Sequence, residues 1–485
     1  MYKRSVNSHY RFRKVKTKSG SIAIQVGFYQ KDRKFKLIKH LGSSSKPEKI
    51  NELIAIAQEY IQSHSPQLKL NFNSQSDEVM FTRGIQMQSK SLELAYKYFN
   101  SVYDQLGFNK LENDLLKNFV FIRILEPASK IKSIELLKKY FGIGYKKTTV
   151  FRKLLSVVPL KDSIIGIAIN YARKHFGFDF SLVFYDITTL YFETNQHDEF
   201  RLNGFSKDNK INQPQILVGL MVNNIGFPVY YDTFKGNTFE GHTIIPAISA
   251  IKTKYKIEKL TVVADAGMLS QDNLNALEEA KIDYVVGARI KKLNINQVRE
   301  IASKLVKTNG RSIKQDNIIY EYSIKRARKD KADNDKQIKK AEYLEDHPTQ
   351  VNRRSSFLLP TGKSTFNLNQ EIIDKYRLLE GIKGYKTNIN KISNKLLINR
   401  YKDLWRVEQS FRIAKSDLQA RPIYHRKQDS INYHLLIVFV ALCLSRIMEQ
   451  EKQQSIKKIV EELKDVWTIT IKDEISGNQL KFNTN

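Results

Sequence analysis

The sequence predicts an α/β protein whose core is a mixed β-sheet flanked by helices. Between residues 181 and 290, strand-like and helix-like segments follow one another in the order β-β-β-α-β-α-β. Such an order forms a three-strand antiparallel meander that is extended by βα units. Two acids, Asp186 and Asp265, fall on or at the end of these strands, where we expect the functional groups of such a sheet.

The composition favours a folded protein with a polyanionic partner. The chain has 485 residues, which is enough for about three domains of ordinary size. Its formal net charge of +31 favours nucleic acid as the partner. Because 41% of the residues are hydrophobic, with 26 Phe and 24 Tyr, we expect folded domains rather than a disordered basic tail.

The sequence also favours a cytoplasmic protein without membrane contact. Its single cysteine, Cys443, excludes an internal disulfide and fits a reducing compartment. The apolar run from Leu435 to Ser445 is far shorter than the ~20 residues of a membrane span and predicts a buried core helix. The first residues, MYKRSVNSHYRFRK, lack the apolar stretch of a secretory signal.

A small β-meander followed by a helix is predicted for residues 1–65. Residues 10 to 39 alternate polar and apolar side chains around two turn signals. Residues 45 to 48, SKPE, form a capping box before a segment of helical period. Residues 63 to 82 are rich in Ser, Asn and Gln and predict a linker.

A helical domain is predicted for residues 83–180. Its segments space apolar residues at i, i+3 and i+4, with breaks at Gly107, Pro127 and residues 142 to 144. Outward-facing basic residues on these helices suit a helix-turn-helix-like DNA reader, and they suit a solvated helix surface equally well. These basic residues are Lys130, Lys132, Lys138, Lys139, Lys146, Lys147, Arg152 and Lys153.

The sheet core is predicted in two parts, residues 181–290 and residues 396–449. Residues 291–395 lose the βα order and are too long for a loop, so we predict an inserted, β-rich subdomain there. Its charged run from Lys325 to Lys340 predicts a solvated helix or a flexible arm. The chain then ends in an amphipathic segment, residues 450–485. The order of the core elements is that of a ribonuclease H-like catalytic core.

Three acids are predicted to converge on this core, namely Asp186, Asp265 and Glu408. In a ribonuclease H-like sheet the first and fourth strands are neighbours, and the last core helix packs across them. Three close carboxylates raise one another's pKa unless a cation neutralises them, and Mg²⁺ prefers such oxygen ligands. We therefore predict a site for two Mg²⁺ ions, which Mn²⁺ can replace. Two ions about 3.5–4 Å apart stabilise the attacking and the leaving oxygen of a displacement at phosphorus.

Glu408 belongs to a segment with a regular spacing of polar side chains. Tyr401, Glu408 and Lys415 follow one another at intervals of seven residues, so one α-helix would return all three to nearly the same face. Arg412 lies four residues after Glu408 and widens that face. Taken alone, the segment is more typical of a surface helix in which Glu408 pairs with Arg412.

Several other side chains compete for a functional role. Asp232 also ends a core strand and is the main rival acid, whereas Glu193 lies on the opposite face of its strand from Asp186. His425 and His434 lack the spacing of zinc ligands, which favours a structural role. Loop candidates are Asn237, Thr238 and Glu240, which a simple turn explains, and Lys207 and Lys210, which either contact DNA phosphate or solvate a loop.

Motifs along nearly the whole chain are similar to those of one family. They are FYDITTLYFE, GFSKDNKINQPQILVGL, FKGNTFEGHTIIP, VVADAGMLSQDNL, KRARKD, GYKTN and YKDLWRVEQSFRIAKSDLQARPIYHR. The sequence resembles the bacterial insertion-sequence transposases of the DDE class, in the group with a Tyr-Arg-Glu-Lys signature. The resemblance implies that Asp186, Asp265 and Glu408 bind metal. It also implies that Tyr401 and Lys415 hold DNA phosphates, and that the insertion is the β-rich subdomain of this group.

The signature is incomplete in this chain. The family's Arg, four residues before the Glu, is replaced by Leu404. Arg406 points to the other side of a helix, so Arg400 or Arg412 is the expected substitute for the phosphate contact. The aromatic residue that often follows the second acid is absent from residues 268 to 270, which removes one argument for hairpin formation on the excised ends.

The resemblance implies a DNA transposase that cleaves transposon ends with Mg²⁺ and joins their 3′-OH groups to target DNA. As endonuclease and strand transferase it would carry out cut-and-paste transposition, as a homodimer on double-stranded terminal inverted repeats and without a small-molecule substrate. Its expected location is the cytoplasm of a bacterium, on the nucleoid. Two alternatives stay open, a ribonuclease H-like structure-selective DNA nuclease and a catalytically decayed derivative that only binds DNA.

Overall fold

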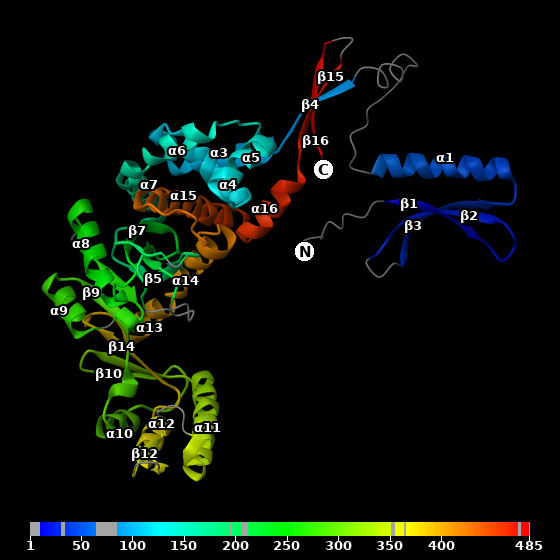
Figure 1. The fold of residues 1–485 in the computed structure, drawn as a ribbon. Coiled ribbons are helices and arrows are strands. Elements are labelled where there is room, and N and C mark those ends of the chain that lie inside the picture. Colours follow the sequence, from blue (N-terminus) through cyan, green and yellow to red (C-terminus); the bar gives the residue numbers. More distant parts are fainter. Residues whose placement is uncertain are drawn as a thin grey trace. The chain divides into compact units, whose positions relative to one another are not determined.

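The computed structural model contains two compact units (Figure 1). Unit 1 comprises Met1–Gln86 and Lys472–Asn478, and unit 2 comprises Met87–Ile471 and Gln479–Asn485. The structure describes residues 10–30, 34–64, 85–194, 196–204, 212–257, 259–268, 270–350, 355–362, 365–473 and 477–484. Lys207, Lys210 and most of the predicted linker lie outside the described residues.

Unit 1 contains a three-stranded antiparallel meander and one helix. Apolar residues alternate along the central strand, so that Ile24 and Val26 are buried on one face together with Ala57 of the helix. Pro47 is the first residue of the helix, where its missing N–H would have no intrahelical partner. The elements are β1 (Arg11–Lys16), β2 (Ile22–Tyr29), β3 (Phe35–Ser44) and α1 (Pro47–His64).

Unit 2 is organised around an eight-stranded sheet in the order β10-β11-β14-β9-β8-β5-β6-β7. β5, β6 and β7 are antiparallel neighbours, while β8 and β9 run parallel to β5. The first and fourth core strands, β5 and β8, are therefore adjacent, as predicted. The core strands are β5 (Val183–Tyr191), β6 (Gln215–Val222), β7 (Pro228–Lys235), β8 (Thr261–Ala264) and β9 (Asp283–Ala288).

Different helices cover the two faces of this sheet. On one face, the hydroxyl of Tyr185 donates to Thr243 Oγ1 at 3.0 Å, just before α8 (Ile244–Tyr255). On the other face, Thr188 lines an apolar pocket together with Leu435 of α15. Because successive strand residues alternate in direction, odd-numbered residues of β5 face α8 and even-numbered ones face α15. We call these the α8 face and the α15 face. A further helix, α9 (Gln271–Glu279), follows β8.

A layer of helices in unit 2 packs around α15. Three of the outer helices end at a glycine in the left-handed conformation, namely Gly107, Gly142 and Gly177. Contacts with α3, α4, α6 and α7 bury α15 along most of its length. The helices are α3 (Glu93–Leu106), α4 (Asp114–Leu125), α5 (Lys130–Phe141), α6 (Lys147–Leu155), α7 (Lys161–Phe176) and α15 (Gln428–Lys452).

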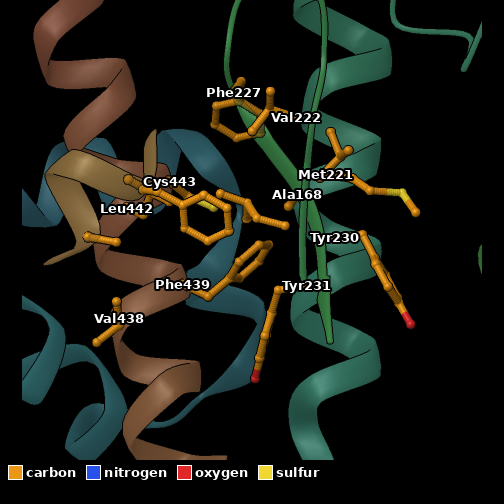
Figure 2. Close-up of a cluster of buried hydrophobic side chains, with 14 of the residues drawn as sticks. Ala168, Met221, Val222, Phe227, Tyr230, Tyr231, Val438, Phe439, Leu442 and Cys443 are labelled. Atoms are coloured by element: carbon orange, nitrogen blue, oxygen red, sulfur yellow. The ribbon is translucent and has the colours of Figure 1, made fainter. Parts of the chain in front are cut away.

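The apolar run near residue 440 is part of a core helix. α15 is long and apolar enough to cross a membrane, yet 89% of its most apolar 18-residue window is buried inside the protein. Figure 2 shows Phe439 of α15 beside Tyr231 of β7, and their ring centroids lie 4.9 Å apart. Cys443 belongs to the same buried cluster. The prediction of a buried core helix is therefore confirmed, although the helix extends beyond the predicted run at both ends.

The segment predicted as a β-rich insertion is mainly helical, which corrects that prediction. The charged run forms a helix because Ile338, Ala341 and Leu344 recur on one side of it and pack against β12 and β13. Three of the strands in the segment extend the main sheet. The elements are α10 (Ile295–Lys304), β10 (Ser312–Gln315), β11 (Ile318–Tyr322), α11 (Ile324–Asp346), β12 (Leu358–Pro360), β13 (Phe366–Leu368), α12 (Gln370–Leu378) and β14 (Ile382–Thr387).

The C-terminal segment contains strands as well as an amphipathic helix. After α16 (Ile456–Asp465), the alternating sequence TITI forms β15 (Thr468–Asp473). β15 pairs with β16 (Gln479–Asn483) and with β4 (Ile85–Ser91) in a small sheet. β4 lies in a region for which only helices were predicted, because its polar sequence, IQMQSKS, has little strand character of its own.

Candidate active site

Asp186 lies on β5, and Asp265 directly follows the end of the neighbouring parallel strand β8. The register of β5 and β8 pairs Phe184 with Val263. Asp186 follows Phe184 by two residues, and Asp265 follows Val263 by two residues. If this register continued past the end of β8, both carboxyl groups would lie next to each other on the α15 face.

Backbone amides orient both carboxylates. The N–H of Ile187 donates to Asp186 Oδ1 at 2.8 Å, and the N–H of Ala266 donates to Asp265 Oδ1 at 2.7 Å. Asp186 is half-buried within β5, whereas Asp265 is exposed just beyond the end of β8. The second acid is therefore open to a ligand, and the first is partly enclosed by the sheet.

The segment from Tyr401 to Lys415 is not one continuous α-helix, which corrects the prediction. α13 (Asn394–Lys402) ends in a tight turn, in which the N–H of Leu404 donates to Tyr401 O at 3.1 Å. α14 (Trp405–Arg412) then begins, and it passes into a π-helical turn, Ile413–Asp417. Leu404 is only 6% exposed, so packing of this side chain into the core holds the turn in place. The seven-residue spacing therefore does not keep its three polar residues on one helix face.

Tyr401 nevertheless reaches the second acid. Its hydroxyl donates to Asp265 Oδ1 at 3.2 Å. Gly287 of β9 makes this approach possible, because a Cβ there would lie only 2.7 Å from the Tyr401 hydroxyl. Burial raises the pKa of Tyr401, and the negative charges of Asp265 and Glu408 raise it further. The phenol therefore stays protonated and lies within the field of two of the three predicted acids.

Glu408 lies in the first turn of α14 and is exposed. The helix packs against β5 and β6, and the hydroxyl of its Ser410 donates to Gly226 O at 3.0 Å. Val407 and Phe411 are buried on the side of α14 that faces the core. α14 thus crosses the strand that carries Asp186, but in the described part of the chain Glu408 does not join the two Asp residues in a group close enough to hold a metal ion.

The basic residues that were predicted to contact DNA lie in different parts of the structure. Lys415 lines the pocket on the α15 face that also contains Thr188, two residues beyond Asp186. Arg412 instead lines a groove of about 560 Å³ together with Arg406, and none of the three acids lines that groove. Arg400 is half-buried on α13. Lys415 is therefore the predicted cation that lies on the same sheet face as Asp186.

Lys383 of β14 is a cation that the sequence did not single out. Its Nζ lies 4.5 Å from the centroid of the Tyr401 ring. Burial lowers the pKa of Lys383, with Arg326 adding to the effect, whereas Asp265 and Glu321 act in the opposite direction. In the strand sequence IKGYKT, Lys383 and Tyr385 lie two residues apart and therefore on the same face of the strand. This spacing could have drawn attention to Lys383, but it does not reveal that Tyr401 lies beside it.

A groove lined by side chains of both charges begins next to the second acid. It measures about 470 Å³ and is lined by Ala266, the residue after Asp265. Arg289 donates from Nη2 to Ala266 O at 3.0 Å and so lies at this end of the groove. The other charged residues that line it are Lys291, Lys292, Arg326, Asp330, Asp333 and Glu380. Acids therefore balance most of the positive charge in this groove.

The rival acid Asp232 lies on the other face of the sheet. The strand register aligns it with Gly219 and Ile187, so it points to the α8 face, opposite to Asp186. Its Oδ1 also pairs with Lys161 Nζ at 2.8 Å. Among the turn candidates, Glu240 approaches the loop after Asp265, since a Cβ on Gly267 would lie 3.6 Å from Glu240 Oε2.

The sheet defines an α/β protein with one acid on β5 and a second acid directly after the neighbouring parallel strand β8. Residues 177–444, more than half of the chain, match the family described as the transposase DDE domain, and the chain belongs to this family. All three predicted acids lie within the matched residues. The recognition of the family from the sequence motifs is thus confirmed, and the chain has a function in DNA transposition.

Two solved structures are similar to this chain. One is the cryo-EM structure of the piggyBac transposase synaptic complex with hairpin DNA, with 11% identity, a TM-score of 0.37, and coverage of 79% of this chain and 81% of that chain. The other is the Drosophila P element transposase strand transfer complex, with 13% identity, a TM-score of 0.18, and coverage of 71% and 80%. None of the curated proteins matches the chain.

Proposed function

We propose that this protein cleaves DNA at the ends of its own element and joins the resulting 3′-OH groups to target DNA. Asp186, Asp265 and Glu408 are the proposed metal-binding acids. The register of β5 and β8 is the observation that supports this assignment, because the two Asp residues follow one pair of that register by two residues each, on the sheet that α14 crosses. The proposal includes a ribonuclease H-like core and a homodimer on paired terminal inverted repeats.

The donor set fits the divalent metal that DDE transposase domains generally use. Carboxylate oxygens are the ligands that Mg²⁺ and Mn²⁺ prefer. Within the described ranges, no group of three or more His, Cys, Asp or Glu side chains is gathered closely enough to hold an ion. For all three acids to hold the metal together, Glu408 would therefore have to approach Asp186 and Asp265. Bound ions would stabilise the charge on the attacking and the leaving oxygen at phosphorus.

The neighbouring side chains supply position and charge. Tyr401 orients Asp265 through its hydrogen bond, and its neutral phenol adds no charge to the acids. Lys383 and Lys415 lie where they can hold substrate phosphates. The net charge of +31 favours DNA binding overall.

Alanine variants at the three acids test this function. We expect Asp186→Ala, Asp265→Ala and Glu408→Ala each to lower Mg²⁺-dependent cleavage of end DNA by a factor of at least ~10³ while leaving DNA binding intact. Asp232→Asn is the matched control, because this acid lies on the α8 face, and it should cleave normally. Full cleavage by any of the three alanine variants would remove that residue from the site.

A strand-transfer assay with a precleaved end separates the transposase from the two alternatives. Joining of the 3′-OH to a target plasmid supports the proposed function. Cleavage of branched DNA without joining would indicate a structure-selective nuclease instead. DNA binding without either reaction, in protein that melts cooperatively, would indicate a catalytically decayed derivative.

A further inference from the structure

A second group of basic side chains lies outside the acid site, at the N-terminal end of α5. It lines a cavity of about 110 Å³ whose walls come from α4, α5, α15 and the segment before α15. The side chains that matter are Arg123, Ser129, Lys130, Tyr424, His425 and His434. Lys130 was predicted to face outward, but it is only 4% exposed, because the first turn of α5 packs against α15.

Two basic side chains in this cavity are buried without a carboxylate partner in the described part of the chain, and burial together with the charge of Arg123 lowers the pKa of Lys130 well below its ordinary value. Arg123 is 5% exposed, and within the described residues its one hydrogen bond is from Nη2 to Ala128 O, at 2.9 Å. Lys130 Nζ lies 3.2 Å from His434 Nδ1, and no acid in the described part of the chain pairs with it. A buried guanidinium stays protonated, and its charge is unfavourable without a compensating anion. A bound anion would favour the charged form of Lys130 as well.

The pKa values of the two histidines in the cavity are lowered by burial and by the same positive charges. Burial lowers the pKa of His425 to about 4, and the positive charges of Lys130 and Arg123 lower it further. His434 is affected in the same way and is held by a contact of 3.0 Å between its Nε2 and Ala420 O. Both rings are therefore neutral at pH 7, so they add no charge but supply polar nitrogen atoms to the wall.

The shape of the cavity suits a small anion. Its volume is far above the ~10–15 Å³ that one water requires. The N-terminus of α5 adds the positive end of a helix dipole, and Ser129 caps this helix by accepting from the N–H of Lys132 at 3.3 Å. Arg123, Lys130 and the helix N-terminus together complement a tetrahedral oxyanion.

The rim of the cavity points to nucleic acid as the source of this anion. Tyr424 lines the cavity and is 69% exposed, so one side of its ring is free to stack on a base. Arg426 and Lys427 beside it are exposed as well, and Arg421 is half-buried. A free phosphate ion would use only the buried cations, whereas a DNA strand would also use this basic and aromatic rim.

We propose that this cavity binds one phosphate group of a DNA strand between Arg123 and Lys130, with a neighbouring base on Tyr424. It is a second DNA contact, separate from the acids on β5 and β8. The choice of DNA as the source of the phosphate rests on the proposed function, but binding of a phosphate group does not.

The first test measures phosphate binding by the full-length protein without DNA. We expect the Tm of the wild type to rise by a few degrees when chloride is replaced by inorganic phosphate at equal ionic strength. Lys130→Met and Arg123→Met should lose this rise. Lys132→Met is the matched control and should keep it, because Lys132 is exposed and pairs with Glu135 at 2.7 Å. A wild-type Tm that does not respond to phosphate would overturn the site.

The second test measures binding of a 30-base-pair DNA duplex across a range of NaCl concentrations. Lys130→Met should bind about tenfold more weakly, and its log Kd against log[salt] slope should fall by ~0.9, the value for one lost phosphate contact. Tyr424→Ala is an exposed change that does not threaten folding. It should weaken DNA binding but keep the response to inorganic phosphate. A phosphate response combined with unchanged DNA binding in Lys130→Met would overturn the assignment to DNA.

Asp186→Ala distinguishes this proposal from the proposed reaction. This variant should keep both the phosphate response and the DNA salt slope while losing cleavage. If the acids prove not to be needed for cleavage, the proposal for the cavity is not affected. If the cavity does not bind phosphate, the role of the acids in cleavage is still decided by their own variants.

Discussion

Two groups of charged side chains in unit 2 differ in how their charges are balanced. Beside Asp265, the buried carboxylate of Glu321 has partners within the protein. Lys402 Nζ lies 2.6 Å from Glu321 Oε1, and the hydroxyl of Tyr385 donates to the same carboxylate at 2.8 Å. Tyr401 donates to Asp265 in turn. This region is therefore assembled before any substrate binds.

The cavity at α5 shows the opposite arrangement. Arg123 and Lys130 share a small buried volume with two neutral histidines, and the described residues supply no carboxylate to compensate them. A candidate binding site can therefore be recognised from buried charged side chains that have no partner of opposite charge, as well as from the residues that it contains. We call the surroundings of Asp265 the balanced region and the cavity at α5 the unbalanced cavity. Changes that disturb packing should damage the balanced region, whereas changes of pH or of the anion in solution should act on the unbalanced cavity.

The largest effect is expected where the balanced region is most tightly packed, at Gly287. A Cβ at this position would lie 2.7 Å from the Tyr401 hydroxyl and 3.1 Å from the Cβ of Ala266. Gly287→Ala should therefore lower the free energy of unfolding by about 1–3 kcal/mol and move Tyr401 away from Asp265. Urea denaturation and Mg²⁺-dependent cleavage measure the two effects. Gly144→Ala is the control, because a Cβ there meets no atom within 4 Å.

A pH-dependent effect is expected in the unbalanced cavity. His425 has a folded-state pKa of about 4, below its ordinary value of 6.5, so the unfolded chain binds more protons between these two pH values. Stability contributed by the neutral ring is present above pH 6.5 and is lost as the pH falls toward 4. His425→Gln should make this part of the stability profile flatter by about 1–2 kcal/mol, after allowance for partial exposure.

Chemical denaturation at a series of pH values measures this difference. The exposed His347, changed to Gln, serves as the control and should leave the profile as it is. Inorganic phosphate should reduce the loss of stability at low pH in the wild type, since an anion between Arg123 and Lys130 favours the protonated ring. An unchanged profile in His425→Gln would show that this ring titrates in the same way in the folded and unfolded chain.

The sequence predicted the parts of the fold that depend on local periodicity. The β-β-β-α-β-α-β order and the core helix followed from apolar spacing, and the adjacency of β5 and β8 followed from the order itself. Asp186 and Asp265 could be paired in this way because both sit on strands of that order. These features need only neighbours in the chain and general rules of sheet topology.

The missed features depend on residues that are far apart in the chain. The turn at Leu404 and the π-helical turn after Arg412 are set by core packing, which seven-residue spacing does not encode. Lys383 meets Tyr401 only because β14 joins the main sheet. Lys130 is buried because His434 lies against it, although the two residues are 304 positions apart. Local patterns contain no information on such pairs.

The smallest expected effect concerns a single hydroxyl group in the balanced region. Tyr401→Phe removes the bond to Asp265 and keeps the ring beside Tyr385 and Lys383. Unfolding should become easier by only about 0.5–1.5 kcal/mol, the usual net value of one hydrogen bond. Cleavage should fall as well, because Asp265 loses the group that orients it.

Combining the two changes tests whether Gly287 is needed for this hydroxyl in particular. The ring in the Tyr401→Phe variant has no oxygen atom that could clash with the new Cβ. The Gly287→Ala substitution should therefore lower the free energy of unfolding less in the Tyr401→Phe variant than in the wild type. A double-mutant cycle in urea measures this coupling. If the two costs simply add, the methyl group at residue 287 must clash with Ala266 instead, and the hydroxyl of Tyr401 would not be what requires glycine in β9.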